Sequence, residues 1–195
     1  MVQLIQLSHP GRQCPKGLNK ETVAPSAVPF SPALATMFGT PRELTHEEIL
    51  DIIKRFATAA QICEKAGFDG VQLHGAHGYL ISQFLSPLTN KRTDQWGGSV
   101  ENRTRFLLEV YKAVREATSD NFIISVKLNS ADFQRGGISE EDVISVFKAV
   151  DDAGIDLIEI SGGTYEAPAM AGAKADKRKA STIAREAYFL DFAEK

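Results

Sequence analysis

The sequence predicts an α/β fold built around a parallel sheet. Short β-rich runs alternate with amphipathic helical patterns, and parallel neighbouring strands need crossover connections of that kind. Two segments, 66-AGFDGVQLH-74 and 153-AGIDLIEIS-161, also repeat one order: an Ala-Gly helix exit, a hydrophobic residue, an Asp and a strand. The repeat indicates successive helix-to-strand units.

Four strands are expected from runs rich in β-branched and aromatic residues. Three helices are expected from apolar residues that recur at helical spacing. The expected strands cover approximately 2–7, 68–73, 122–128 and 155–160, and the expected helices cover about 47–65, about 100–117 and a segment that begins near Ser139.

The ends of these helices carry capping signals. Thr45 and Glu48 form a capping box ahead of the first helix, and Gly67 follows it where a left-handed C-terminal cap is expected. Ser139 is a good N-cap for the third helix, and the three acidic residues after it complement the helix dipole. Each cap supplies a partner for backbone groups that a helix end leaves free.

Two segments show neither the helical nor the strand periodicity. Residues 13–42 are rich in Pro, Ser and Gly and are expected to form a long excursion over a strand end. Residues 162–181 are expected to form a second loop, in which four basic residues gather between 174 and 179. A basic cluster can contact phosphate or nucleic acid, but a solvated loop is the interpretation we favour.

The composition is that of an ordinary soluble globular chain. Its 195 residues suit a single domain, 1–195, with 43% hydrophobic and 24% charged residues. The formal charge of −3, without a long block of either sign, argues against nucleic acid or an anionic membrane as a partner. Cys14 and Cys63 form no CxxC pair, and no apolar run reaches about 20 residues. We therefore expect a cytoplasmic protein with reduced thiols.

Two architectures fit this order of elements. A doubly wound sheet closes with about this number of strands, whereas a (β/α)8 barrel typically needs about 250 residues. The length favours the doubly wound sheet, and the residues at the strand ends favour the barrel. No GxGxxG pattern follows a strand, so a Rossmann dinucleotide site is not indicated.

Polar residues gather at the carboxyl ends of the four expected strands. Ligands bind at that edge in parallel α/β folds, because the strand ends and the following loops converge there. These residues are Gln6 and His9, then His74, His77 and Tyr79, then Lys127, Asn129 and Asp132, and finally Ser161. Their shared position makes them the candidate site.

His74 and His77 allow three interpretations. A zinc site is one, but the pair lacks the helix and nearby glutamate of the familiar two-histidine motif, and no third ligand is apparent. Both histidines could instead satisfy loop carbonyls. The third interpretation is a pair of imidazole donors aimed at a substrate carbonyl oxygen, with Tyr79 as the neighbouring proton source.

The third interpretation has a physical basis. Two donors that converge on a carbonyl oxygen stabilise the enolate-like charge that forms when hydride adds to the conjugated carbon. A phenol with an ordinary pKa of about 10 stays protonated at neutral pH and can then donate the proton.

Lys127 alternates with Val126 and Leu128, so its ammonium can face the barrel interior. There it needs an anionic or strongly accepting partner, such as the pyrimidine edge of a reduced flavin.

Three segments resemble the old yellow enzyme family of FMN-dependent NAD(P)H:flavin oxidoreductases and ene-reductases. They are 6-QLSHPGRQ-13, 68-FDGVQLHGAHGYLISQFLSPLTNKRTDQWGGSVENRTRF-106 and 126-VKLNSADFQRGG-137. The long central block is highly specific, and the resemblance extends over nearly the entire chain. It implies FMN as cofactor, NAD(P)H as reductant and an α,β-unsaturated carbonyl as substrate. It also implies a partial TIM (β/α)8 barrel, approximately strands 3 to 6 with their helices.

The resemblance further implies roles for individual residues. Gln6 is similar to the glutamine that contacts the FMN pyrimidine ring, and His74 and His77 to the pair that hold the substrate carbonyl and border the flavin. Tyr79 resembles the residue proposed to protonate the substrate after hydride transfer from flavin N5. Lys127 stands where many relatives have arginine beside flavin N1 and O2, and lysine keeps the charge but loses the planar fork. No residue is assigned to a metal.

The remaining strands of the family barrel fall outside these segments. Two would precede the first strand, and two that carry the glycine-rich phosphate site and an arginine would follow the last. We therefore expect an open half-barrel with two exposed sheet edges and an apolar inner face, which on its own is unstable, oligomerises or pairs with a complementary fragment. A catalytically silent fragment or interaction module is the alternative to an active ene-reductase.

Arg103 and Arg105 are expected to tie their loop to the barrel rather than to act in chemistry.

Overall fold

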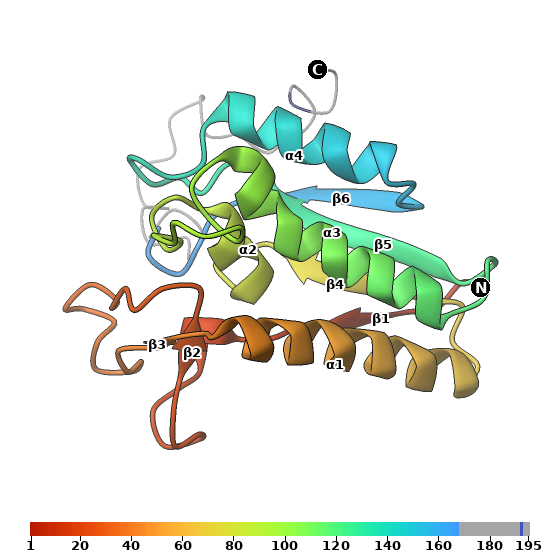
Figure 1. Ribbon diagram of the computed structural model, residues 1–195, viewed down its shortest axis with the longest axis horizontal. Coiled ribbons are helices and arrows are strands. Elements are labelled where there is room, and N and C mark those ends of the chain that lie inside the picture. Colours follow the sequence, from red (N-terminus) through yellow and green to blue (C-terminus); the bar gives the residue numbers. More distant parts are fainter. Residues whose placement is uncertain (168–191, 193–195) are drawn as a thin grey trace, which may run out of the picture.

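The structure, a computed structural model, describes residues 1–167 and Phe192. Its four longest strands are β1 (Leu4–Leu7), β4 (Gly70–Gly75), β5 (Ile123–Asn129) and β6 (Leu157–Ser161). The α-helices are α1 (His46–Lys65), α2 (Leu80–Leu85), α3 (Val100–Ala117) and α4 (Glu140–Asp152). The strands form one parallel sheet in the order β1-β4-β5-β6, so α1, α3 and α4 lie in the crossover connections between neighbours. All three helices cover the same face of the sheet (Figure 1).

A capping box and a serine cap fix the starts of α1 and α4. The Thr45 hydroxyl accepts a hydrogen bond from the Glu48 N–H, and the Glu48 carboxylate accepts in return from the Thr45 N–H. The Ser139 hydroxyl accepts from the N–H of Asp142. Gly67 takes a left-handed φ of 90° just after α1. The ends predicted for α1 and α3 agree with the structure to within one residue.

Three of the strands reach further toward their carboxyl ends than the sequence predicts. The predicted ends are residues 73, 128 and 160, whereas β4, β5 and β6 end at Gly75, Asn129 and Ser161. His74 consequently lies within β4, whereas Lys127 lies within β5 as expected. Side chains alternate across a strand, so a polar residue is accommodated when it points to the face that the helices leave open.

The core lies between the sheet and the helices. The helix-facing residues of the two central strands are fully buried, and the ring of Phe84 in α2 stacks on that of Phe106 in α3, 4.2 Å between centroids. The buried strand residues are Val71 and Leu73 in β4 and Ile124, Val126 and Leu128 in β5. Removal of this apolar surface from water is the main force that holds the helices on the sheet.

The opposite face of the sheet is largely polar, so the prediction of an apolar inner face is wrong. Polar residues project there from all four strands and hydrogen-bond to one another: Gln6, Gln72, Ser125, Lys127 and Glu159. Leu157, at the start of β6, is an apolar exception and is 53% exposed. The alternating pattern of each strand therefore separates an apolar face under the helices from a polar face around the candidate site.

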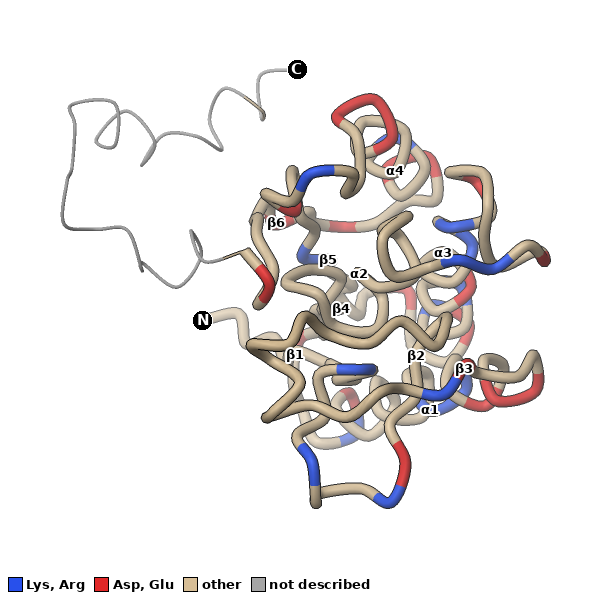
Figure 2. The backbone as a smooth tube through the Cα atoms, turned by 90° about the vertical axis from the view of Figure 1, so that its left-hand side faces the viewer, with Lys and Arg blue, Asp and Glu red and all other residues tan. Residues whose placement is uncertain are grey.

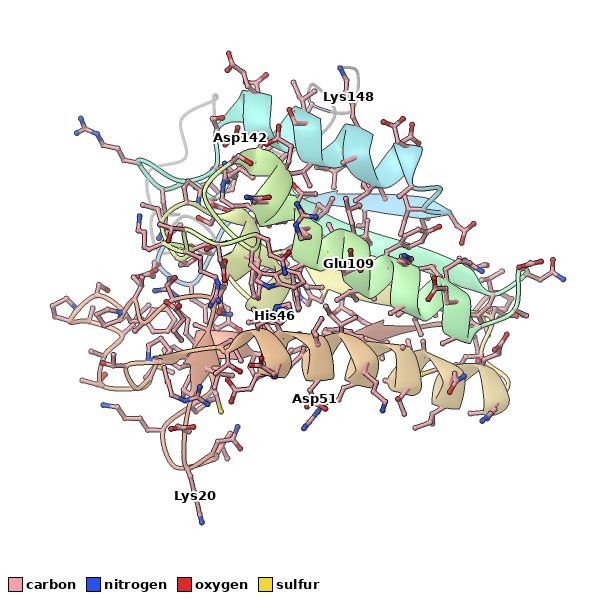
Figure 3. All side chains as sticks on the ribbon, in the orientation of Figure 1. Lys20, His46, Asp51, Glu109, Asp142 and Lys148 are labelled. Atoms are coloured by element: carbon pink, nitrogen blue, oxygen red, sulfur yellow. The ribbon has the colours of Figure 1, made fainter. Side chains whose placement is uncertain are left out.

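The excursion at 13–42 contains part of a small strand pair that the sequence does not predict. β2 (Val23–Ala24) pairs in parallel with β3 (Arg42–Glu43). Each of these strands is too short to show a period-two pattern. Lys20 projects from this excursion and points away from the sheet (Figure 3).

Two short helices beside the site are also missing from the prediction. They are the 3₁₀ helix η1 (Gly11–Gln13) and α2. All six residues of α2 are buried, so this helix has no exposed polar face from which a helical period could be recognised.

Arg103 and Arg105 secure the loop before α3, as predicted. The buried guanidinium of Arg103 donates to the Asp142 carboxylate at 2.6 Å and to the Leu85 carbonyl oxygen. Arg105 donates to the Gln95 carbonyl oxygen at 2.8 Å. Both arginines therefore join segments of the chain on the helix side of the sheet.

Charges of both signs are interspersed along the described backbone (Figure 2). The basic cluster expected between 174 and 179 lies outside the described residues. No helix in the part of the chain that the structure describes is long and apolar enough to cross a membrane.

Candidate functional site

The candidate site lies at the carboxyl edge of the sheet, where the strands end and the loops gather on the left of Figure 1. After His74, β4 ends at Gly75 and the chain turns through His77 and Gly78, which have φ angles of 60° and 76°. A left-handed histidine is uncommon and costs free energy, so its surroundings must hold this turn. Tyr79 follows as the N-cap of α2.

The His74 ring is buried, and one contact defines its tautomer. Its Nδ1 accepts a hydrogen bond from the Ala76 N–H at 3.3 Å. A neutral ring therefore carries its proton on Nε2. Burial, followed by the charges of His77 and Lys127, lowers the pKa of His74 to about 4. At pH 7 His74 is neutral and offers an N–H donor without a positive charge.

His77 is held by the ends of β5 and β6. Its ring Nε2 lies 2.7 Å from Ser161 Oγ, and its backbone N–H donates to Asn129 Oδ1 at 3.2 Å. The Asn129 amide in turn donates to Asp132 Oδ1 at 3.1 Å. Burial and then the charge of Lys127 lower the pKa of His77. The Ser161 hydroxyl therefore engages Nε2 of this ring.

Tyr79 completes the aromatic cluster. Its ring centroid lies 4.7 Å from that of His74, which is 5.1 Å from that of His77. The Tyr79 hydroxyl is 2.8 Å from the hydroxyl of Tyr165 in the loop after β6. This hydrogen bond, together with burial, raises the pKa of Tyr79 to about 12. The phenol therefore remains protonated at neutral pH.

An ion pair fixes the loop that carries Tyr165. The neighbouring Glu166 carboxylate accepts from buried Arg12 and also from the Ser31 N–H at 3.3 Å. The Arg12 guanidinium lies over the ring of Phe30, 4.1 Å from its centroid. These contacts join the excursion after η1 to the loop after β6.

Lys127 is paired with Glu159 of β6. Its Nζ lies 2.7 Å from Glu159 Oε1. The other carboxylate oxygen of Glu159 accepts from the Gln72 amide at 2.9 Å, and Gln72 Oε1 accepts from the Gln6 amide at 2.7 Å. One chain of polar contacts thus crosses β1, β4, β6 and β5.

This donor set fits a planar ring that offers carbonyl oxygens and ring nitrogens along one edge, such as the pyrimidine ring of a flavin. The donors are the Gln6 amide, the Lys127 ammonium and the His74 Nε2–H, all on the open face of the sheet. His74 and Lys127 are direct neighbours in the strand register. The set supplies hydrogen bonds and one cation, which are the usual means by which a protein adjusts the electronic properties of a bound flavin.

The structure brings most of the predicted site residues together. His74, His77 and Tyr79 form one cluster. His9 instead stabilises the turn that follows it, because its Nδ1 accepts a hydrogen bond from the Gly11 N–H at 3.0 Å. Sequence reasoning missed three residues: Gln72, Glu159 and Tyr165. The first two alternate with apolar neighbours, as Lys127 does, so the same period-two signal could have found them. Tyr165 has no such signal, because it lies in a loop far along the chain that only the fold brings beside Tyr79.

Comparison with known proteins identifies a family. The model of the NADH:flavin oxidoreductase / NADH oxidase family matches residues 2–188. The chain is 41% identical to the NADH-dependent flavin oxidoreductase nadA of Aspergillus parasiticus over 98% of this chain and 43% of that protein. It is 48% identical to an NADPH dehydrogenase of Clostridium acetobutylicum over 82% of this chain and 45% of that protein. The chain therefore spans less than half the length of these two relatives.

The fold is similar to that of an old yellow enzyme homologue from Zymomonas mobilis. The two share 27% identity with a TM-score of 0.75, over 97% of this chain and 60% of the solved one. Such neighbours are (β/α)8 barrels, so the four-stranded sheet is part of a barrel wall. This confirms the partial TIM barrel and excludes the doubly wound sheet.

Proposed function

The chain belongs to the NADH:flavin oxidoreductase / NADH oxidase family, and on that premise we propose that it contributes the substrate edge of an FMN-dependent ene-reductase. The reaction moves a hydride from NADH or NADPH through FMN to the activated C=C bond of an α,β-unsaturated carbonyl compound. In this proposal Gln6, His74 and Lys127 bind the flavin. His74, His77 and Tyr79 bind the substrate, and Tyr79 protonates it.

One observation carries the proposal. Two imidazole rings and a phenol meet at the carboxyl edge of a parallel sheet, with ring centroids 5.1 and 4.7 Å apart. Donors and an acid are the groups that reduction of a conjugated carbonyl requires, because negative charge develops on its oxygen and a proton must reach its carbon.

The two histidines bind and polarise the carbonyl oxygen. His74 donates from Nε2, since Nδ1 is engaged by the Ala76 N–H. His77 donates from Nδ1, with Ser161 at its Nε2. The lowered pKa of both rings keeps them neutral at pH 7, so they hydrogen-bond to the oxygen without losing a proton to it.

Tyr79 supplies the proton. With its pKa raised to about 12, the hydroxyl is fully protonated at pH 7 and donates only to a strongly basic carbon such as that of an enolate. FMN, held by Gln6, His74 and Lys127, would supply the hydride carrier between the nicotinamide and the substrate. Lys127 contributes a cation on the open face beside His74, which would stabilise the negative charge that a bound flavin gains on reduction.

A reconstitution experiment tests the proposal. The purified 195-residue chain is mixed with FMN, and binding is followed by quenching of flavin fluorescence. NADH or NADPH is then added without oxygen to measure flavin reduction, and a simple enone is added to measure reoxidation. We expect FMN binding, flavin reduction and enone-dependent reoxidation.

Each step of that experiment has its own consequence. If FMN does not bind, the proposal is wrong for this chain, and the silent fragment is the better description. If FMN binds and is reduced but no enone reoxidises it, the chain is a flavin oxidoreductase with another acceptor. A His77→Ala variant should bind FMN as the wild type does and bind the enone more weakly, because it loses one carbonyl donor while Gln6, His74 and Lys127 remain.

A further inference from the structure

Glu159 is an acidic residue on a strand whose other central residues are apolar. It alternates with Ile158 and Ile160, so its side chain lies on the open face of the sheet. The register pairs Glu159 with Lys127, and Lys127 with His74. An acid, a base and an imidazole therefore form one row across three strands.

Both oxygens of the Glu159 carboxylate are used. Oε1 lies 2.7 Å from Lys127 Nζ, and Oε2 accepts from the Gln72 amide at 2.9 Å. These two contacts restrain the ammonium to one place on the open face. The hydrogen bond from Lys127 is the main reason why the pKa of Glu159 is lowered, so the carboxylate is charged at pH 7.

Fold stability alone gives little reason for this ion pair. The backbone ladder already holds β5 beside β6, with five residue pairs from Ser125↔Leu157 to Asn129↔Ser161. The Lys127 side chain is 19% exposed and that of Glu159 is 45% exposed. A pair with that much access to water contributes little to stability. By contrast, the Arg103–Asp142 pair joins α3 to the start of α4.

The consequence of the pair is therefore electrostatic. Without Glu159, the Lys127 ammonium would present a full positive charge to whatever binds beside His74. With Glu159 in contact, much of that charge is cancelled. The effect extends to the histidines, since the Lys127 charge lowers the pKa of both rings and the Glu159 charge raises it.

We propose that Glu159 is a positioning residue that holds Lys127 and offsets its charge, and thereby limits how strongly the site prefers reduced over oxidised flavin. This inference rests on the proposed function, because it needs a flavin edge beside Lys127. Reduction adds negative charge to that edge, and a free ammonium would favour the reduced form. By weakening that preference, Glu159 keeps the bound flavin a better hydride donor to the substrate.

The test compares Glu159→Gln with two other variants of the 195-residue chain. Glu159→Gln removes the charge and keeps a hydrogen-bonding side chain of the same size. Glu159→Asp keeps the charge but shortens the reach to Lys127. Glu116→Gln on α3 is the matched control, because it removes one negative charge from a side chain that is 68% exposed on the helix side of the sheet. Far-UV circular dichroism checks that each variant is folded.

The main measurement is the midpoint potential of bound FMN, together with the dissociation constant of oxidised FMN. In Glu159→Gln we expect reduced flavin to gain about tenfold in binding relative to oxidised flavin, which for a two-electron couple is about 30 mV upward. Glu159→Asp should fall between this variant and the wild type, and Glu116→Gln should match the wild type.

A second measurement needs no flavin. NMR titration of His74 and His77 in the apo chain should show the pKa of both rings lower in Glu159→Gln than in the wild type, because the offsetting negative charge is gone. If Glu159→Gln binds FMN with an unchanged midpoint potential, the role proposed for Glu159 is wrong, and the proposed function is not affected. Unchanged histidine titrations would show that the carboxylate does not reach the site. Failure of the wild-type chain to bind FMN would instead overturn the proposed function, and with it the flavin role of Glu159.

Discussion

The hydroxyl oxygens of Tyr79 and Tyr165 lie 2.8 Å apart, although 86 positions separate the two residues in the chain. Tyr79 begins α2, and Tyr165 belongs to the loop after β6. The two rings are edge-on, with centroids 6.0 Å apart. Tyr165 is 44% exposed, so the pair connects the interior of the cluster with water.

Replacement of Tyr165 by Phe should lower the pKa of Tyr79. The hydrogen bond between the hydroxyls is the largest cause of the rise to about 12, and burial is the second. The variant keeps the ring, so the Tyr79 pKa should move back toward the ordinary value of about 10. Ultraviolet absorbance of tyrosinate during an alkaline titration, with Tyr79→Phe to identify the signal, measures it. An unchanged Tyr79 titration would show that the two hydroxyls do not interact.

Replacement of Tyr79 by Phe should slow alkene reduction while leaving flavin reduction by the nicotinamide nearly unchanged. Only the second half-reaction needs a proton at carbon, and loss of a general acid typically costs about 10²–10⁴-fold. Stopped-flow absorbance of the flavin separates the two half-reactions. Tyr165→Phe is the control, because it retains the Tyr79 hydroxyl. Equal slowing of both half-reactions by Tyr79→Phe would argue against this residue as the proton donor.

His74 should make folding stability depend on pH in mildly acidic solution. Its folded pKa of about 4 lies below the ordinary 6.5, so between these values the unfolded chain binds the proton more readily. The stability is complete above about pH 6.5 and is lost as the pH falls toward about 4. The difference is on the order of 3 kcal/mol.

Urea unfolding of the wild type and of His74→Gln at both ends of that pH range measures this effect. Carboxylates titrate in the same range, so the relevant quantity is the difference between the two proteins. The wild type should lose more stability on acidification than the variant. Equal losses would mean that His74 is not held neutral by the fold.

Removal of the Arg103 side chain should destabilise the protein without a specific effect on the site. Its side chain is 6% exposed and donates to the Leu85 carbonyl oxygen and to the Asp142 carboxylate, whose side chain is 30% exposed. Loss of one partner of such a buried pair costs about 3 kcal/mol. In Arg103→Met we therefore expect that decrease in the free energy of unfolding, measured with urea.

A surface cation provides the comparison for Arg103. Lys112 on α3 is 67% exposed and lies 4.0 Å from Glu116. Lys112→Met should change the free energy of unfolding by less than about 0.5 kcal/mol. Similar losses in the two variants would contradict a structural role for the buried arginine.

Local signals in the sequence were sufficient for the long helices and for the alternation of strands with helices that indicates a parallel sheet. The Thr45 and Glu48 capping box, the Ser139 cap and Gly67 each act within a few residues of the helix that they bound. The α2 helix was missed because all of its residues are buried, so no amphipathic period marks it. Amphipathic patterns reveal an element only where one of its faces meets water.

The sequence by itself determined which residues point to chemistry: His74, His77, Tyr79 and Lys127 stand at or near the ends of strands, and alternation assigns the lysine to the open face. Only the tertiary structure decided their partners. Glu159 reaches Lys127 because β6 pairs with β5 in one register, and Tyr165 reaches Tyr79 because a loop returns over α2. Side-chain alternation is a local property of the chain, whereas strand register and loop return depend on the packing of segments far apart in sequence. The charge beside His74 and the pKa of Tyr79 therefore depend on the tertiary structure and not on the local sequence.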